Sequence, residues 1–213
     1  MVRQDPILIA APPRSGTTAL AAVLHAHGVW VGKGRTTRYP GTNMDFASEN
    51  TDIKGVMKEM ALEMGYENWN VPFPNSAGFD QDEAKERIEI YPPDNTPWLV
   101  KTSWTLTFWQ FWETNYPDAR WLFPIRDIDK IVDSMNRHPG MRKHPDKEKY
   151  DYVNALQRNR FEVIITNIKY HCFNIEKFIY NEEDAIRDVF SFLDITPNWD
   201  IINTILKPTM LKR

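Results

Sequence analysis

The chain has 213 residues, 42% hydrophobic and 26% charged, which favours a single globular domain spanning residues 1–213. Its net charge of −3 gives no overall positive field for a nucleic-acid backbone, so an anionic ligand must be held by a local group of cations. The single cysteine, Cys172, excludes an internal disulfide and is typical of a reducing compartment.

Membrane and export signals are not apparent in the sequence. No apolar run approaches the ~20 residues that a membrane helix needs. The apolar stretch at residues 6–11 is too short for the core of a signal peptide. We therefore predict a cytoplasmic protein without a membrane partner, unless a longer precursor was trimmed.

The first elements are a strand, a tight turn and a helix. A short apolar run predicts a buried strand over 7–11, followed by a turn over 12–16 and a helix over 17–27. The polar residues 31–50 form a connection longer than usual, which is either functional or mobile. A second helix is predicted over 51–64.

The middle of the chain is rich in aromatic residues. Residues 66–80 are predicted to be irregular and 81–89 to form a short charged helix. A second strand over 98–102 precedes a helix that carries Trp109, Trp112 and Tyr116.

The last third continues the alternation of strands and helices. The predicted elements are a strand over 120–125, a helix over 128–138 with Asp127 as N-cap, a helix over 147–168, a strand over 172–175, a helix capped by Asn181, and a short helix from Asn198. This alternation predicts an α/β fold of three layers, with a mainly parallel central sheet flanked by helices.

An anion site is predicted where the first strand meets the first helix. The unpaired N–H groups and the dipole at a helix start both favour an anion. Gly16 permits close backbone approach, and the hydroxyls of Ser15, Thr17 and Thr18 can donate to anionic oxygens. Arg14 adds a forked cation at the turn.

This turn differs from a nucleoside-triphosphate loop, G-x-x-x-x-G-K-[ST]. Thr17 stands where that loop has its lysine, and the first glycine is missing. A triphosphate would lose the cation at its β/γ-phosphates, whereas a two-group anion such as a phosphosulfate demands less. The difference disfavours an ordinary kinase or NTPase.

Residues 12–18, Pro-Pro-Arg-Ser-Gly-Thr-Thr, resemble the phosphosulfate-binding loop of sulfotransferases that use 3′-phosphoadenosine-5′-phosphosulfate (PAPS), usually written P-[KR]-[ST]-G-T-[ST]. Residues 121–127, with Ser134 eight residues after Arg126, resemble the 3′-phosphate site of that family. Lys101, at the end of the second predicted strand, resembles a family lysine that lies close to the donor.

The resemblance implies a P-loop-like sulfotransferase architecture and a defined activity. A sulfuryl group would pass from PAPS to a hydroxyl or amine of a small-molecule or carbohydrate acceptor, releasing 3′,5′-bisphosphoadenosine (PAP). Arg14 and Lys101 would stabilise the charge that grows on the bridging oxygen. The implied donor-binding residues are Arg14, Ser15, Gly16, Thr17, Thr18, Arg126 and Ser134.

The general base is the point at which the chain departs from part of the family. Members with a K-T-H motif have a histidine where this chain has Ser103, which is a poor base. Carbohydrate and bacterial-type relatives commonly use a glutamate after the first helix, which makes Glu49 the predicted base and Asp45 the reserve. The alternative is that Ser48 caps the second helix and Glu49 only favours its first turn.

Two other interpretations stay open. A P-loop-type, nucleotide-dependent kinase would need Mg²⁺ and a lysine after Gly16. A non-catalytic protein with a sulfotransferase-like fold would bind PAP or PAPS without turnover. No cysteine pair or clustered histidine and carboxylate set has metal-ligand spacing, so no metal is expected. The residues predict neither the acceptor nor the oligomeric state.

Overall fold

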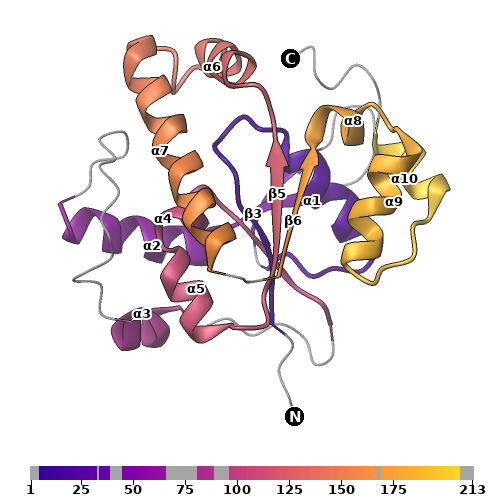
Figure 1. Ribbon diagram of the computed structural model, residues 1–213, viewed down its shortest axis with the longest axis horizontal. Helices are drawn as coiled ribbons and strands as arrows, with labels where there is room; N and C mark the ends of the chain where they lie inside the picture. The colour runs from indigo at the N-terminus through magenta and orange to yellow at the C-terminus, as the bar shows by residue number, and fades with distance from the viewer. Residues whose placement is uncertain are drawn as a thin grey trace.

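The computed structural model describes residues 5–32, 34–38, 45–65, 81–88, 96–166 and 169–206, and for 34–38, 45–49 and Gln81 it describes the backbone only. At its centre is a parallel four-stranded sheet in the order β4-β1-β5-β6 (Figure 1). The strands are β1 (Ile7–Ile9), β4 (Leu99–Lys101), β5 (Arg120–Ile125) and β6 (Tyr170–Asn174). The α/β fold with a parallel sheet is confirmed.

The central strand β1 is buried on both faces, as the middle layer of a three-layer fold requires. Its residues are all buried, as expected for a parallel strand covered on both faces. Ile7 and Ile9 point into one hydrophobic cluster, whereas Leu8 points into another that contains Trp98 and Trp121. Alternate side chains of one strand therefore join two cores.

Helices cover both faces of the sheet (Figure 1). One face carries α1 (Thr17–Ala26), α8 (Ile175–Ile179), α9 (Glu183–Phe192) and α10 (Trp199–Ile205). The other carries α2 (Thr51–Glu63), α3 (Gln81–Arg87), α4 (Trp104–Thr107), α5 (Trp109–Asn115) and α7 (Asp146–Ile165). Helix α6 (Ile128–Asn136) lies beyond the carboxyl end of β5 and packs on α7 through Ile131, Met135 and Val153.

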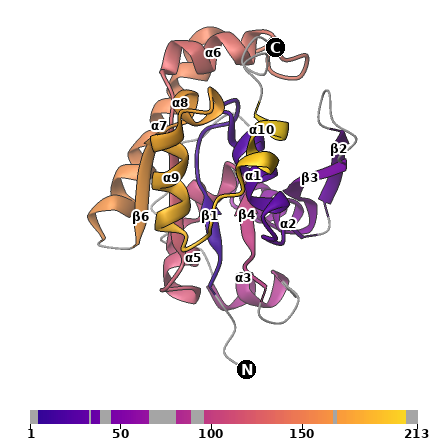
Figure 2. The ribbon, with the colours of Figure 1, turned by 90° about the vertical axis from the view of Figure 1, so that its right-hand side faces the viewer.

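Three predicted segments differ from the structure. The connection over 31–50 contains an antiparallel hairpin, β2 (Gly34–Arg38) and β3 (Asp45–Asn50), which lies near β4 and away from β6 (Figure 2). The Asn50 side chain accepts the Ile53 N–H at 3.1 Å and caps α2, so Ser48 is not the cap.

The second difference lies near the C-terminus. Asn174 caps α8, a helix absent from the predicted elements, by accepting the N–H groups of Glu176 and Lys177 at 2.9 and 3.1 Å. Asn181 is not an N-cap, because it adopts a left-handed φ of 63° after α8. The N-cap of α9 is Glu182, and the helix begins at Glu183. Asn174 and Asn181 are both residues that can cap a helix, and the sequence alone does not show which of them does so.

The third difference is a short helix, α4, that precedes the predicted aromatic helix, which is confirmed as α5 with Tyr116 as its C-cap. Phe108, with φ −107° and ψ 37°, separates α4 from α5. Its ring is buried among the tryptophans of the same cluster.

Candidate functional site

The site is built where the carboxyl ends of the parallel strands meet the start of α1. The turn after β1 places Gly16 in the left-handed conformation, with φ 77°. Helix α1 then begins at Thr17 without a side-chain cap and without an acidic residue in its first turn. Its first N–H groups and its dipole therefore favour an anion.

Helix α8 supports this turn from behind. A Cβ at Gly16 would lie 2.7 Å from Ile179 Cδ1 and 3.0 Å from Ile175 Cγ1. The buried Ser15 Oγ has no hydrogen-bond partner among the described residues. A buried hydroxyl without a partner is costly, so a ligand oxygen at this turn would relieve it.

Lys101 brings a cation from β4 to the beginning of α1. Its side chain is buried, and Nζ donates to Thr18 Oγ1 at 3.2 Å. The register of the sheet explains the contact, because Ile9, just before the turn, pairs with Lys101. The structure thus joins Lys101 to the start of α1, and its place beside a donor stays a prediction.

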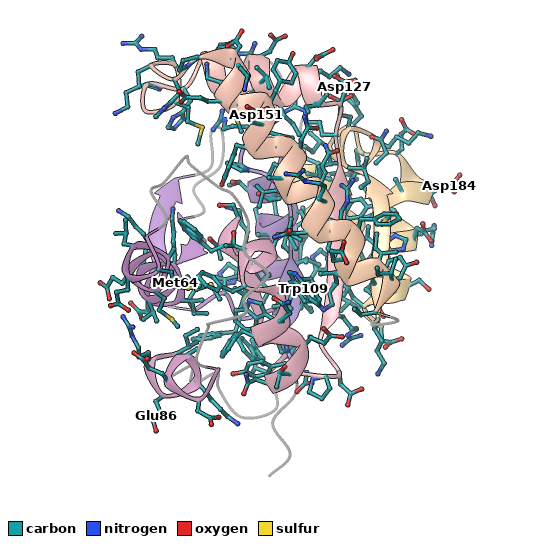
Figure 3. All side chains as sticks on the ribbon, turned by 60° about the vertical axis from the view of Figure 1, so that its left-hand side comes forward. Met64, Glu86, Trp109, Asp127, Asp151 and Asp184 are labelled. Atoms are coloured by element: carbon teal, nitrogen blue, oxygen red, sulfur yellow. The ribbon has the colours of Figure 1, made fainter. Side chains whose placement is uncertain are left out.

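Arg14 joins the loop to α6. Its Nε donates to Ser134 Oγ at 3.1 Å across 120 residues of sequence. Its backbone carbonyl, in a residue with φ 69°, accepts Arg126 Nη1 at 2.7 Å. Asp127 caps α6 by accepting the Lys130 N–H at 3.1 Å, which confirms the predicted cap (Figure 3). These contacts bring the two sequence motifs together.

Glu176 is a neighbour of this group that the sequence did not indicate. Its carboxylate lies 3.4 Å from Arg126 Nε and accepts Lys130 Nζ at 2.6 Å. The lysine beside it has a raised pKa, chiefly through that hydrogen bond. Glu176 comes from α8, the helix that was not predicted.

Positive charge accumulates around Arg14. The pKa of Arg14 is lowered first by burial and then by the charges of Arg126 and Arg137. The pKa of His138 is lowered by burial and by Arg14. Arg137 follows Ser134 by three residues, and residues at this spacing lie on the same face of a helix. The sequence therefore could have indicated that Arg137 lies near Ser134.

A pair of hydroxyl groups lies just beyond Lys101. Ser103 shares a hydrogen bond with Tyr152 of α7, and burial raises the pKa of that phenol to about 12 against the effect of the hydrogen bond. Tyr152 therefore stays protonated at neutral pH and is not a base there.

The predicted base lies outside the described side chains. Glu49 and Asp45 belong to β3, whose backbone packs beside α1 and β4. The side chains of both residues fall outside the described part of the structure. Glu49 stays a prediction.

The described residues lack two features of other protein classes, a metal-binding cluster and a membrane helix. No group of three or more histidine, cysteine or carboxylate residues among them could hold a metal ion. Within the same part of the chain, no helix combines the length and the apolar character that crossing a membrane requires.

Known proteins share a sequence profile and a fold with this chain. The sequence profile of the Sulfotransferase family matches residues 6–200. No curated protein sequence is similar enough to be recognised as a relative.

Solved structures share the fold at low sequence identity. The sulfotransferase domain of the curacin biosynthetic pathway has a TM-score of 0.56 and 14% identity, covering 100% of this chain and 87% of that one. The sulfotransferase domain of the Synechococcus PCC 7002 olefin synthase has a TM-score of 0.60 and 13% identity, with 100% and 85% covered. A sulfotransferase of Mycobacterium tuberculosis H37Rv has a TM-score of 0.61 and 14% identity, with 96% and 71% covered.

The match to the family profile extends from before β1 into α10, and it contains the turn before α1, Lys101, Arg126 and Ser134. With the shared parallel-sheet fold, it establishes that the chain belongs to the sulfotransferase family.

Proposed function

We propose that the protein transfers a sulfuryl group from PAPS to a hydroxyl or amine of a small-molecule or carbohydrate acceptor and releases PAP. The observation that carries the proposal is the contact of Arg14 with Ser134, because it links the turn before α1 to α6. An anion site at a helix start and a second cationic group thus share one edge of the sheet. PAPS carries anionic groups at two positions and suits such a pair of sites.

The buried polar groups are consistent with this donor. Ser15 Oγ, the first N–H groups of α1, Thr17 and Thr18 would hold the phosphosulfate. Arg126 and Ser134 would hold the 3′-phosphate. None of these roles requires a metal ion.

The transfer breaks the bond between sulfur and the bridging oxygen and forms a bond from sulfur to the acceptor atom. Negative charge grows on the bridging oxygen, and Lys101 and Arg14 are the candidate cations that stabilise it. The acceptor loses a proton, for which Glu49 is the candidate base. Removing Lys101 would cost about 10²–10³ in rate if it has this role.

The first experiment is thermal unfolding of the protein with PAP, AMP, ADP or ATP, with and without Mg²⁺. At a PAP concentration 100-fold above Kd, we expect the Tm to rise by roughly 5–10 °C without metal. Arg126→Ala should abolish most of this rise. Arg158→Ala, an exposed arginine on α7, should leave it unchanged.

The competing functions give different results. A shift with ATP that requires Mg²⁺ and is absent with PAP would reject the proposal in favour of a kinase. PAP binding without sulfuryl transfer to a broad panel of phenols, alcohols, amines and sugars would favour a non-catalytic binder.

A further inference from the structure

The outer face of α7 carries large apolar side chains near its C-terminal end. Phe161 and Ile165 stand one helical turn apart, and 63% and 55% of their surfaces are exposed. Tyr170, at the start of β6, is 41% exposed. The other large apolar side chains that are exposed in the described part of the chain, Leu62 and Tyr180, lie on α2 and at the end of α8. A gathered group of exposed apolar side chains is typical of a contact surface, whereas single ones are ordinary.

Tyr170 belongs to the same side of the sheet as α7. Strand β6 lies at the edge of the sheet and has β5 as its one neighbour among the described strands. The Tyr170 ring lies 6.2 Å from that of Phe123, which is buried in the core beneath α7 together with Val163. We call Phe161, Ile165 and Tyr170 the outer strip. Figure 1 shows this end of α7 beside the start of β6, away from α6 and from the carboxyl ends of the strands.

Two opposite charges flank Phe161 on the same helix. Arg158 and Glu162 are both exposed and stand one turn apart. Within the described residues, neither side chain has an ion-pair or hydrogen-bond partner. The exposed pair at the other end of α7 differs, because Lys147 Nζ already donates to Asp151 at 2.7 Å. The outer strip is therefore bordered by one cation and one anion that are available to a partner.

These charges are complementary to a second copy of the same face. A two-fold axis beside Arg160 would set two α7 helices antiparallel, so that Arg158 meets Glu162 of the second copy, and the symmetry repeats this contact. Each Phe161 would lie one residue, about 1.5 Å along the helix, from the axis, so the two rings would meet at the centre. A parallel pair would instead bring like charges together, which is unfavourable.

We infer that the chain forms a symmetric dimer through the outer strip, with the two α7 helices antiparallel, Phe161 at the centre and Arg158 opposite Glu162 of the second copy. The contact has an apolar centre and a charged rim, as protein interfaces do. A single pair of helices is a small interface, so we expect a Kd of about 1–100 μM. The dimer leaves the carboxyl ends of the strands open, and the inference does not depend on the proposed function.

The experiment measures self-association of the full chain by sedimentation velocity over roughly 1–500 μM, a range that brackets the expected Kd. The variants are Phe161→Asp, Arg158→Glu, Glu162→Arg and the double variant that carries both charge reversals. Asp184→Arg is the matched control, because it reverses an exposed charge on α9, on the opposite face of the sheet (Figure 3). All four positions are exposed, so the variants should fold, which circular dichroism checks.

We expect the wild type and Asp184→Arg to dimerise alike. Phe161→Asp and each single reversal should weaken the dimer by at least about tenfold, because a desolvated charge or two like-charge contacts replace favourable ones. The double variant should dimerise again, since the pair is kept with its signs exchanged. An equimolar mixture of Arg158→Glu and Glu162→Arg should also dimerise, because both charge contacts of the mixed dimer join opposite charges.

Three results would overturn the inference. A wild type that stays monomeric over the whole range has no such dimer, and the outer strip then serves another partner or none. A dimer that Phe161→Asp leaves intact uses a different surface. Failure of both the double variant and the mixture to dimerise, when the single reversals are monomeric, excludes the antiparallel pairing of Arg158 with Glu162.

Discussion

At the residue scale, Gly16 combines two demands that only glycine meets. Its φ is 77°, and a Cβ there would come within 2.7 Å of Ile179. We expect Gly16→Ala to lower the free energy of unfolding by about 2–4 kcal/mol, from backbone strain together with the steric conflict against α8. Urea unfolding measures the loss.

Gly28→Ala is the matched control. Gly28 has a similar φ of 88°, but a Cβ there would meet nothing within 4 Å. This variant should lose only about 1 kcal/mol, from the backbone alone. Equal losses in the two variants would show that the contact with α8 does not constrain the turn.

His138 gives the site a dependence on pH. Burial and the charge of Arg14 lower its pKa below 6.5, so the folded state binds fewer protons than the unfolded state near that pH. Its neutral Nδ1 also accepts the Gly140 N–H at 3.2 Å. Stability is therefore lost as the pH falls through 6.5 toward the pKa of the folded state.

The measurement is urea unfolding at pH 7.5 and 5.5 for the wild type and His138→Asn. The wild type should lose more stability than the variant on acidification. Bound PAP should oppose the effect of Arg14 and raise the pKa of His138. The affinity of the wild type for PAP should therefore rise, relative to the variant, as the pH falls, a comparison that cancels the titration of the phosphate itself. Identical pH profiles would contradict this linkage.

At the scale of elements, His27 fastens the end of α1 to the start of α10. The ring atom Nδ1 lies 2.7 Å from the carbonyl oxygen of Val23. The other ring nitrogen, Nε2, accepts the Asn198 N–H at 2.9 Å. The ring also packs edge-on against Phe190, with centroids 4.7 Å apart.

His27→Ala should lower the free energy of unfolding by about 1–3 kcal/mol, because it removes two hydrogen bonds, one part-buried and one exposed, and the packing of the ring against Phe190. His25→Ala, which removes a 3.1 Å contact with the Val29 carbonyl within the same segment, should cost less. Denaturant unfolding of both variants provides the comparison, and a larger effect at His25 would argue against the link between α1 and α10.

Local sequence patterns predict some of the helices and strands but not others. The strand at 7–9, the helix α6 with its cap and the strand β5 follow from apolar periodicity and one capping residue. The hairpin β2–β3 and α8 were missed. The start and end of the hairpin and of α8 depend on caps and turns, and several nearby polar residues could form these caps and turns. Packing against other helices and strands selects the positions that are used.

At the scale of the whole molecule, β1 couples the two hydrophobic cores. Ile9 belongs to the cluster with α1, whereas Trp98, Trp112 and Trp121 are buried in the other. We expect Ile9→Ala to cost about 2–5 kcal/mol. Because one strand serves both clusters, tryptophan fluorescence and far-ultraviolet circular dichroism should report the same lowered urea midpoint. Separate midpoints would mean that the cores unfold independently.

The sequence by itself determined the alternating α/β pattern, the tight turn before α1 and the two motifs that contain Arg14 and Arg126. Backbone geometry at a strand–turn–helix junction is local, so residue types in a short segment specify it. The match of the family profile over residues 6–200 agrees with that reading.

Only the tertiary structure decided which charges share a site. The contact of Arg14 with Ser134 spans 120 residues, and the pairing of Arg126 with Glu176 needs α8 against the sheet. Electrostatic grouping depends on distances in space, which spacing along the chain does not contain. The direction taken by the Arg14 side chain therefore emerged only once β1, β5 and α6 were packed together.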